Sequence, residues 1–387
     1  MSKEIIGVVG SGAMGSGIAQ IAATNGHKVY IFDNNKDALV KSKNSIEKIL
    51  NRLIEKGKIT SDQSIKIKSN LNYVSDLKEF KDCNLIIEAI VENINIKKEV
   101  FENLENIATK DCILATNTSS LSVASIASAC KDADRVIGIH FFNPAPLMPL
   151  VEIIPAIQTN QQTISKSKKL IDSWGKETVI TKDTPGFIVN RVARPFYGEA
   201  LRIYEEGIAD FATIDWAMTE LGGFKMGPFT LMDFIGNDVN YKVTETVFEA
   251  FYYDPRYKPS LTQKRHFEAG WYGRKTGKGY FDYSNDEKPL PQKNEQLGKQ
   301  IVERIVVMLI NEAVDALYLN IANKEDLETA MTKGVNYPKG LLHWCDELGS
   351  QYVLNKLDEL HNLYLEDRYR ASVLLRKMAE NNQKFFS

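Results

Sequence analysis

The sequence is poor in cysteine and lacks long apolar runs. Its four cysteines show neither the paired spacing of zinc ligands nor a disulfide framework; they are Cys83, Cys112, Cys130 and Cys345. We therefore expect reduced thiols and no metal site. No apolar run approaches the roughly 18 residues of a membrane-spanning helix, and no signal-peptide pattern opens the chain. These absences predict a cytoplasmic protein without a membrane partner.

An excess of positive charge is also missing. The net charge is −2, with 48 basic and 50 acidic side chains, so no global field favours nucleic acid or an anionic membrane. The chain has 43% hydrophobic and 25% charged residues, which is typical of a globular protein. Because 387 residues exceed one average core, we expect two or three domains.

The N-terminal residues have the pattern of a nucleotide-binding βαβ unit. An apolar strand over residues 5–9 runs directly into the glycine-rich segment 10–15, which opens a helical pattern. Residues 28–33 form the next strand, and Asp33 closes it. A glycine motif alone is weak evidence, but here a strand, a helix and an acid surround it as a dinucleotide site requires.

Each glycine of this segment has a physical role in such a site. Gly10 allows the tight turn, Gly12 lets the backbone approach a pyrophosphate, and Gly15 lets helix and strand pack closely. The helix N-terminus at Ala13 and Met14 offers unsatisfied N–H groups to the phosphates. The alternative is that these glycines only form a tight turn between strand and helix.

Asp33 decides between the two nicotinamide cofactors. It lies 18 residues after Gly15, where a carboxylate can accept hydrogen bonds from both ribose hydroxyls. The same carboxylate repels a 2′-phosphate, and no arginine follows it. The site therefore favours NAD over NADP.

The remaining sequence divides into a sheet-forming half and a helical half. A helical arm is expected from residue 37 to about residue 69, and a boundary falls at Thr184-Pro185-Gly186. Between them apolar strands alternate with helical segments; the strands are 85–90, 112–115, 136–139 and 151–154. This pattern predicts an α/β, Rossmann-type, doubly wound parallel sheet followed by all-α structure.

The helical half contains an internal repeat. Residues 188–236 align without a gap to residues 301–349, 113 positions later, and Ala217-Met218-Thr219 matches Ala330-Met331-Thr332. Duplication explains such a run better than chance. We therefore expect three domains, which are an NAD-binding domain with the arm (1–184), a first helical domain (185–284) and a second, degenerate helical domain (295–387).

A polar set centred on His140 has the parts of a general base and its orienter. His140 follows the strand 136–139, at the carboxyl end where such sheets bind ligands. An imidazole suits the removal of a hydroxyl proton, and Glu152 on the next strand could fix its tautomer. Ser119 and Asn143 could donate to a substrate oxygen or to the nicotinamide. Each residue alone is more often structural, so the prediction depends on the set.

Together these motifs resemble those of the L-3-hydroxyacyl-CoA dehydrogenases, including the short-chain 3-hydroxybutyryl-CoA enzymes. The resemblance covers nearly the whole chain and is far more specific than the glycine motif. The segments that carry it are residues 9–15, Ile87-Glu88-Ala89-Ile90-Val91-Glu92-Asn93, Asn117-Thr118-Ser119-Ser120-Leu121, His140-Phe141-Phe142-Asn143-Pro144 and residues 183–191.

The resemblance implies roles for single residues. It places the catalytic pair on His140 and Glu152, with Ser119 and Asn190 beside them. It implies cofactor contacts at Glu92, Lys97, Ser119, Asn143 and Lys275, and substrate contacts at Ser119, Asn143 and Asn190. The helical arm is similar to the one beside the coenzyme A tail, where Lys56 would meet a phosphate. A lysine on such a helix is more often only solvated.

The second helical copy departs from the family pattern. Glu303 stands where the first copy has Asn190, and a carboxylate cannot donate the amide hydrogen bond. We therefore expect this copy to have lost the chemistry and to pack against the first as an internal pseudo-dimer. Further association into a homo-oligomer stays open.

The sequence thus predicts an enzyme, an NAD-dependent dehydrogenase that converts L-3-hydroxyacyl-CoA to 3-oxoacyl-CoA. Two alternatives stay open at this point. One is an NAD-dependent dehydrogenase of another hydroxy acid, such as a sugar acid, which would gain nothing from Lys56. The other is a non-catalytic NAD-binding protein, since folds outlive functions. The complete polar set argues against that last alternative.

Overall fold

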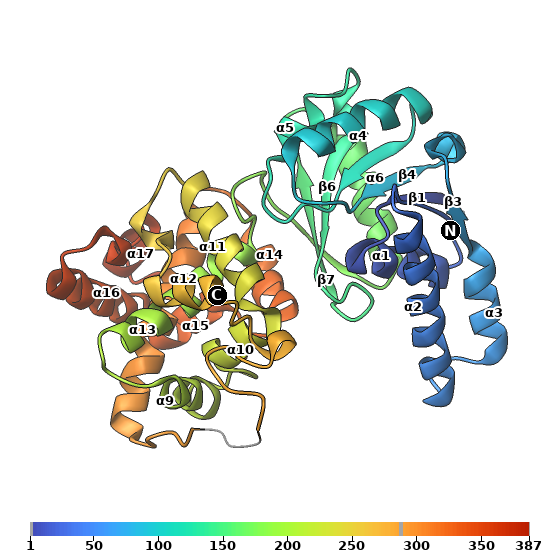
Figure 1. The fold of residues 1–387 in the computed structure, drawn as a ribbon. Helices are drawn as coiled ribbons and strands as arrows, with labels where there is room; N and C mark the ends of the chain where they lie inside the picture. Colours follow the sequence, from blue (N-terminus) through green and yellow to red (C-terminus); the bar gives the residue numbers. More distant parts are fainter. Residues whose placement is uncertain (1–2, 286–288, 387) are drawn as a thin grey trace. The chain divides into compact units, whose positions relative to one another are not determined.

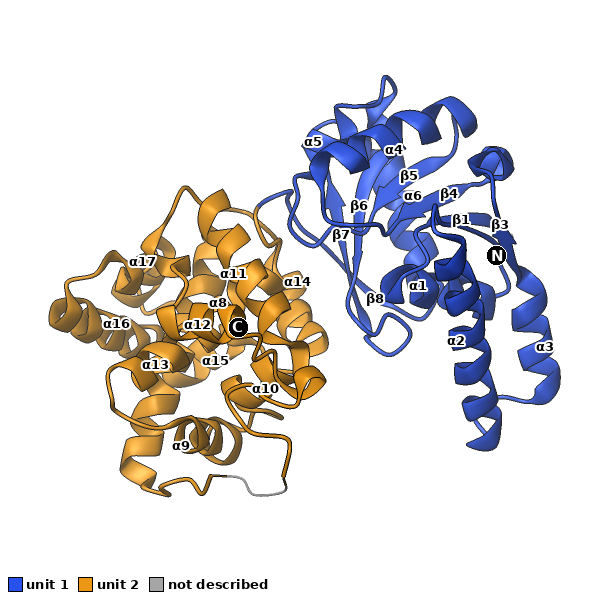
Figure 2. Ribbon diagram, in the orientation of Figure 1, with its two compact units in different colours: residues 1–184 blue, residues 185–387 orange. Residues whose placement is uncertain are grey.

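A computed structural model describes residues 3–285 and 289–386 of the chain. It divides into two compact units, Met1–Thr184 and Pro185–Ser387 (Figures 1 and 2). The first is built around a β-sheet and the second is helical, as the sequence predicted. None of the helices in the described ranges is long and apolar enough to span a bilayer.

The first unit contains one eight-stranded sheet with the order β3-β2-β1-β4-β5-β6-β7-β8. Its strands are β1 (Ile5–Val9), β2 (Lys28–Phe32), β3 (Leu71–Val74), β4 (Leu85–Glu88), β5 (Ile113–Thr116), β6 (Val136–Phe141), β7 (Leu150–Pro155) and β8 (Glu177–Ile180). Strand β3 was not predicted from the sequence; it is a four-residue edge strand whose side chains are only half-buried.

The predicted parallel sheet is confirmed for most of its strands, but its far edge departs from this pattern. Strands β1 to β6 are parallel, but β7 pairs antiparallel with β6, and β8 follows the direction of β7. The reason is the connection 142–149 between β6 and β7. A parallel crossover needs a dozen or more residues, usually with a helix, and this loop is shorter and contains Pro144, Pro146 and Pro149.

Helices cover both faces of the sheet, which confirms the doubly wound arrangement (Figure 1). On one face a single apolar core joins the strands to α1 (Ala13–Thr24), α2 (Lys36–Glu55), α3 (Ser61–Asn70) and α6 (Gln161–Asp172). On the other face lie α4 (Ile94–Ile107) and α5 (Val123–Ala127), which pack against β5 and β6. Strands buried on both faces explain the near-continuous apolar runs in the sequence.

The predicted helical arm consists of two helices, α2 and α3. Helix α2 ends at Glu55 and Gly57 then adopts a positive φ of 66°, which interrupts the helical pattern. Thr60 begins α3 with a reciprocal capping box, in which Gln63 N donates to its hydroxyl and Gln63 Oε1 accepts from its N–H. The mostly polar segment 56–60, with Gly57 and the Thr60 cap, therefore separates the two helices.

The second unit holds the two repeats. The first contains α7 (Val189–Val192), α8 (Arg194–Glu205), α9 (Phe211–Trp216), α10 (Pro228–Ile235), α11 (Asn237–Ala250) and α12 (Leu261–Glu268). The second contains α13 (Glu295–Tyr318), α14 (Lys324–Thr329), α15 (Leu341–Leu348), α16 (Ser350–Tyr364) and α17 (Val373–Glu380). A short π-helical turn follows α9 and α14 alike, at 217–221 and 330–334.

Buried ion pairs join the two repeats in a reciprocal way. Arg191 of the first repeat donates from Nε to Glu312 of the second at 2.7 Å. At the corresponding positions, Arg304 of the second donates to Glu199 of the first at 3.0 Å. The same self-complementary exchange characterises a two-fold interface between identical subunits.

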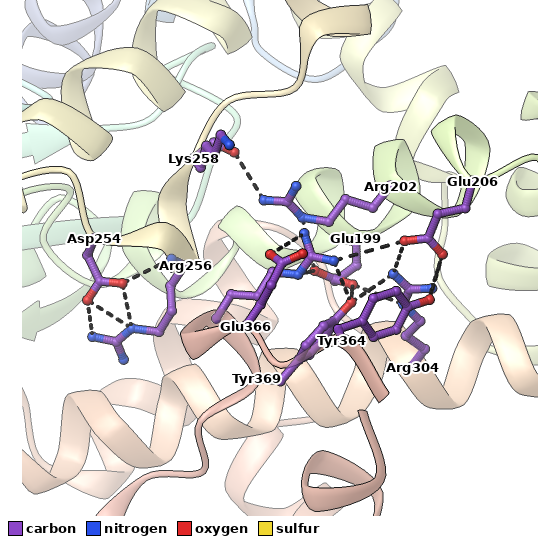
Figure 3. A network of polar contacts seen from close by, with 11 residues as sticks. Glu199, Arg202, Glu206, Asp254, Arg256, Lys258, Arg304, Tyr364, Glu366 and Tyr369 are labelled. Atoms are coloured by element: carbon purple, nitrogen blue, oxygen red, sulfur yellow. Dashed lines mark hydrogen bonds and ion pairs between the residues drawn. The ribbon is translucent and has the colours of Figure 1, made fainter. Parts of the chain in front are cut away.

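A tyrosine completes each pair. Tyr369 donates its hydroxyl to Glu199 at 2.9 Å, and Tyr257 donates in the same way to Glu312. Figure 3 shows the end around Arg304, whose two Nη atoms also reach Glu206 at 2.7 and 2.9 Å. In these exchanged pairs each buried arginine and each buried glutamate therefore meets a hydrogen-bonded partner of opposite sign.

The Glu312→Gln variant should lose about 1.5–3 kcal/mol of unfolding free energy, because the buried Arg191 loses one of its two carboxylate partners and keeps only Asp315, at 3.0 Å. Urea unfolding of the full chain measures this change. Glu268→Gln, at the exposed Arg265–Glu268 pair, is the control and should barely move the midpoint. Equal midpoints for the two variants would show that the exchanged pairs do not hold the repeats together.

Candidate active site

The glycine-rich segment forms the turn that joins β1 to α1. Gly10 has a φ of 99°, and a Cβ there would lie 2.5 Å from the carbonyl oxygen of Ala89. A Cβ on Gly15 would lie 1.9 Å from the carbonyl oxygen of Gly10. Both positions therefore exclude any side chain for reasons of packing alone.

Gly12 is different, because a Cβ at this position would meet no atom of the protein within 4 Å. The space beside it is open, as a close approach of the backbone to a pyrophosphate requires. Gly12 also precedes α1 without a side-chain cap, so the N–H groups that begin at Ala13 and Met14 have no side-chain acceptor there. The turn therefore fits a dinucleotide.

Asp33 lies directly after β2, beside this turn. Its Oδ2 accepts from the N–H of Ser11 at 2.7 Å and from the Ser11 hydroxyl at 2.8 Å, and its Oδ1 accepts from Asn35 N at 2.9 Å. An ionised carboxylate has about four acceptor sites. Asp33 therefore holds the turn in place and keeps capacity for a ribose hydroxyl.

His140 and Glu152 face each other across the antiparallel β6–β7 pair, as direct register partners. His140 Nδ1 lies 2.7 Å from Glu152 Oε2, and the two side chains are only 7% and 0% exposed. The Phe142 ring stands 4.5 Å from the imidazole, centroid to centroid. A carboxylate on Nδ1 fixes the tautomer that leaves Nε2 as the proton acceptor.

Ser119 lies at the carboxyl end of β5, and Glu92 connects it to the neighbouring strand. Glu92 Oε1 accepts from the Ser119 N–H at 3.0 Å and from the Thr118 hydroxyl at 2.5 Å. Its other oxygen lies 3.3 Å from Lys97 Nζ. Burial opposes ionisation of Glu92, but Lys97 and these hydrogen bonds outweigh it and hold the pKa of that carboxyl below its usual range.

Glu88 anchors this group, although the sequence predicted no role for it in the site. Glu88 is fully buried and bonds Lys97 Nζ at 2.6 Å, the Thr116 hydroxyl at 2.8 Å and the Ile90 N–H at 2.7 Å. The sequence does contain a signal for Glu88, because an acid directly follows the apolar strand residues Leu85-Ile86-Ile87. A carboxylate buried at that place needs a charged or hydrogen-bonding partner. Lys97, expected at the cofactor, is itself 1% exposed and directs its ammonium to the two glutamates.

The other expected residues lie at the surface or in the second unit. Asn143 is exposed after β6, and Lys56 is exposed directly after α2. Lys275 of the second unit is 44% exposed and pairs with Asp238 at 2.5 Å. Asn190 lies on α7 and is half-buried. The described residues hold no group of three or more His, Cys, Asp or Glu side chains arranged for a metal ion.

Comparison with known proteins adds an independent line of evidence. Residues 5–184 match the model of the "3-hydroxyacyl-CoA dehydrogenase, NAD binding domain", and residues 186–283 and 301–384 both match the C-terminal domain of the same enzymes. The chain belongs to the 3-hydroxyacyl-CoA dehydrogenase family. NAD is its cofactor, and oxidation of a 3-hydroxyacyl-CoA is its reaction. Family membership therefore favours the 3-hydroxyacyl-CoA dehydrogenase over the two alternatives, a dehydrogenase of another hydroxy acid and a non-catalytic NAD-binding protein.

Relatives of the family match the chain over different lengths. The "3-hydroxyadipyl-CoA dehydrogenase" of Escherichia coli is 35% identical over 98% of both chains. The "probable 3-hydroxybutyryl-CoA dehydrogenase" of Deinococcus radiodurans is 40% identical over 72% of this chain and 99% of its own. A crystal structure of an Escherichia coli 3-hydroxybutyryl-CoA dehydrogenase has a TM-score of 0.94 at 33% identity, over 99% of each chain.

Two glycines with equally open surroundings provide a test of the cofactor turn. Gly12→Ala should raise the Kd for NADH by about tenfold or more without unfolding the protein, because the new methyl group occupies the space of the pyrophosphate. Gly198→Ala in α8 is the control; its Cβ also meets nothing within 4 Å, so NADH binding should not change. NADH fluorescence titration of both variants measures the effect. A normal Kd for Gly12→Ala would contradict this assignment.

Proposed function

We propose that His140 is the general acid and base of a reversible, NAD-dependent oxidation of L-3-hydroxyacyl-CoA, and that Glu152 is its positioning residue. The observation that carries the proposal is the 2.7 Å contact between the two buried side chains on facing strands. A carboxylate held in this way stabilises the imidazolium that forms when the ring takes a proton.

The proton and the hydride leave the substrate separately. In the oxidation, His140 Nε2 takes the proton of the C3 hydroxyl as the C3–O bond becomes a carbonyl. Bound NAD supplies the acceptor for the hydride that leaves C3. In the reverse direction His140 returns the proton to the carbonyl oxygen. Glu152 stays ionised throughout and keeps the ring in the tautomer that this transfer needs.

The remaining site residues have supporting roles in this proposal. Ser119, Asn143 and Asn190 donate hydrogen bonds to the substrate or to the nicotinamide. Glu92 contacts the cofactor and Lys97 acts through it, because Lys97 is already paired with Glu88 and Glu92. Lys56 and Lys275 are the weaker members of the set, since both are exposed and Lys275 is paired with Asp238.

Two classes of acyl chain are candidates for the substrate. The names of relatives suggest either a short monocarboxylic chain, as in 3-hydroxybutyryl-CoA, or a dicarboxylic chain, as in 3-hydroxyadipyl-CoA. Relatives with either name span nearly the whole chain: one is named 3-hydroxyadipyl-CoA dehydrogenase, and the solved Escherichia coli structure is named 3-hydroxybutyryl-CoA dehydrogenase. The names therefore do not choose between the two classes. Either substrate presents the same C3 hydroxyl to His140.

The second repeat, residues 295–387, acts in this proposal as an internal partner of the first, residues 185–284. The exchanged Arg191–Glu312 and Arg304–Glu199 pairs support this pseudo-dimer. At the position of Asn190 the second repeat has Glu303, which bonds the Tyr352 hydroxyl and lies 3.6 Å from Lys356 Nζ. We therefore assign one active site to each chain. Further oligomerisation and a cytoplasmic location stay predictions from the sequence.

His140→Gln should lower kcat for acetoacetyl-CoA reduction by about 10²-fold or more, because an amide cannot exchange the proton. Its Kd for NADH should stay normal. The decrease in NADH absorbance measures turnover. If the wild-type protein oxidises NADH with none of the 3-oxoacyl-CoAs tested, the proposed function is contradicted.

Glu152→Gln tests whether Glu152 acts through the histidine. Alone it should lower kcat strongly, because the imidazolium loses its counter-charge. In the His140→Gln background it should add almost nothing, because residues that act as a unit are not additive. Additive losses in the double variant would assign Glu152 an independent role.

A further inference from the structure

Arg194, at the start of α8, is a buried cation without a carboxylate partner among the residues that the structure describes. Five arginines are buried in the described chain, and four of them have a carboxylate oxygen within 4.0 Å; these are Arg135, Arg191, Arg304 and Arg368. Arg194, which is 7% exposed, has no such partner among the described residues. A buried charge is costly unless it is paired. The lack of a carboxylate beside Arg194 in the described residues therefore requires an explanation.

The contacts of Arg194 satisfy little of its hydrogen-bonding capacity. Of five N–H donors, one on Nη1 reaches the Thr244 hydroxyl at 3.0 Å. The guanidinium lies 4.9 Å from the centre of the Tyr197 ring, a contact that uses no N–H donor. Its Nε is buried without a partner, and so is the hydroxyl of Tyr337 from the second repeat. Donors are abundant at this place and acceptors are scarce.

The ionisation of Arg194 reflects the same shortage. Burial lowers the pKa of its guanidinium, and only Tyr197 and Tyr337 act against the loss of hydration. Burial also opposes the charge of Arg191, but Glu312, Tyr257 and Asp315 outweigh it and raise the pKa of that guanidinium. An added anion would do the same for Arg194.

The repeat shows that the fold does not require these polar groups. Arg194, Tyr197 and Thr244 of the first repeat correspond, 113 positions later, to Val307, Ile310 and Leu357 of the second. Tyr337 of the second corresponds to Phe224 of the first. All four corresponding side chains are apolar and buried. The same scaffold therefore packs well without a cation here, and the polar set at the Arg194 end needs another reason.

Arg194 lies close to a residue of the proposed substrate site. It follows Asn190 by four residues, and the backbone between them stays right-handed helical, with Ala193 at φ −81° and ψ −7°. Residues four apart on a helix share one face, about one turn or 5.4 Å along the axis. Asn190 and Arg194 therefore lie about one turn apart, on either side of the junction between α7 and α8.

We propose that Arg194, with the Tyr337 hydroxyl, binds the terminal carboxylate of a dicarboxylic 3-hydroxyacyl-CoA. The inference rests on the proposed function and selects between its two substrate classes. In a six-carbon chain, three carbon–carbon bonds of about 1.5 Å separate C3 from the terminal carboxyl carbon, about 4 Å when extended. That length matches the one-turn offset between Asn190 and Arg194. A planar guanidinium is suited to bind a carboxylate through two N–H groups.

The wild-type protein tests the proposal directly. The kcat/KM for 3-hydroxyadipyl-CoA should exceed that for 3-hydroxybutyryl-CoA by about tenfold or more, since a buried donor set rejects a substrate that leaves it unpaired. Equal values or a preference for 3-hydroxybutyryl-CoA would overturn the inference while the proposed function stands. If the protein oxidises neither substrate, both the inference about Arg194 and the proposed function are wrong.

Variants then assign the preference to Arg194. Arg194→Val places the residue of the second repeat at this position and should lower the kcat/KM ratio of the two substrates by about 10²-fold. Tyr337→Phe, which copies Phe224, should lower the same ratio by about tenfold. Arg194→Lys should keep part of the preference for 3-hydroxyadipyl-CoA, because lysine keeps the positive charge but lacks the planar guanidinium.

The substrate ratio separates binding of the carboxylate from a structural role. Thermal unfolding first shows whether each variant is folded. If Arg194→Val loses activity on both substrates equally, Arg194 is structural and the inference is wrong. If that variant does not fold, the wild-type ratio and the Arg194→Lys and Tyr337→Phe variants still decide the question.

Discussion

The antiparallel pairing of β6 with β7 is the constraint on which the proposed chemistry depends. It places His140 and Glu152 directly opposite each other, so that the Glu152 carboxylate lies within hydrogen-bonding distance of His140 Nδ1. Opposed residues of such a pair have Cβ atoms about 4.5–5.5 Å apart. A parallel β7 would need a long crossover after His140 and would lose this register. The short proline-rich loop 142–149 is therefore as important to the site as the two side chains.

A second rule, that a buried charge needs a partner, accounts for the buried ion pairs of the protein. In the first unit it ties Glu88, Lys97 and Glu92 into one group behind Ser119. In the second unit it produces the exchanged arginine–glutamate pairs between the repeats. The same rule makes Arg194 conspicuous, because it is the buried arginine in the described ranges that lacks a carboxylate.

Expectations from the sequence were most accurate where the determining residues are neighbours along the chain. The strand, glycine turn and helix of residues 5–24 follow each other directly, so their pattern is legible without a structure. The helical character of the arm was predicted, but the break between its two helices was not, because it depends on Gly57 and on the Thr60 cap. The strand β3 was missed because only four half-buried residues carry its signal. Glu88 was missed because its role appears only when Lys97 and Thr116 lie beside it.

The sequence by itself determined the cofactor turn, the helical repeat and the choice of His140 and Glu152 as a pair, since residue type and short spacing carry that information. Only the tertiary structure decided the direction of β7, the burial of Lys97 between two glutamates and the exchange of ion pairs between the repeats. Arg191 and Glu312 are 121 residues apart in the chain. Which of many arginines meets which carboxylate depends on the packing of distant helices, and no local pattern encodes it.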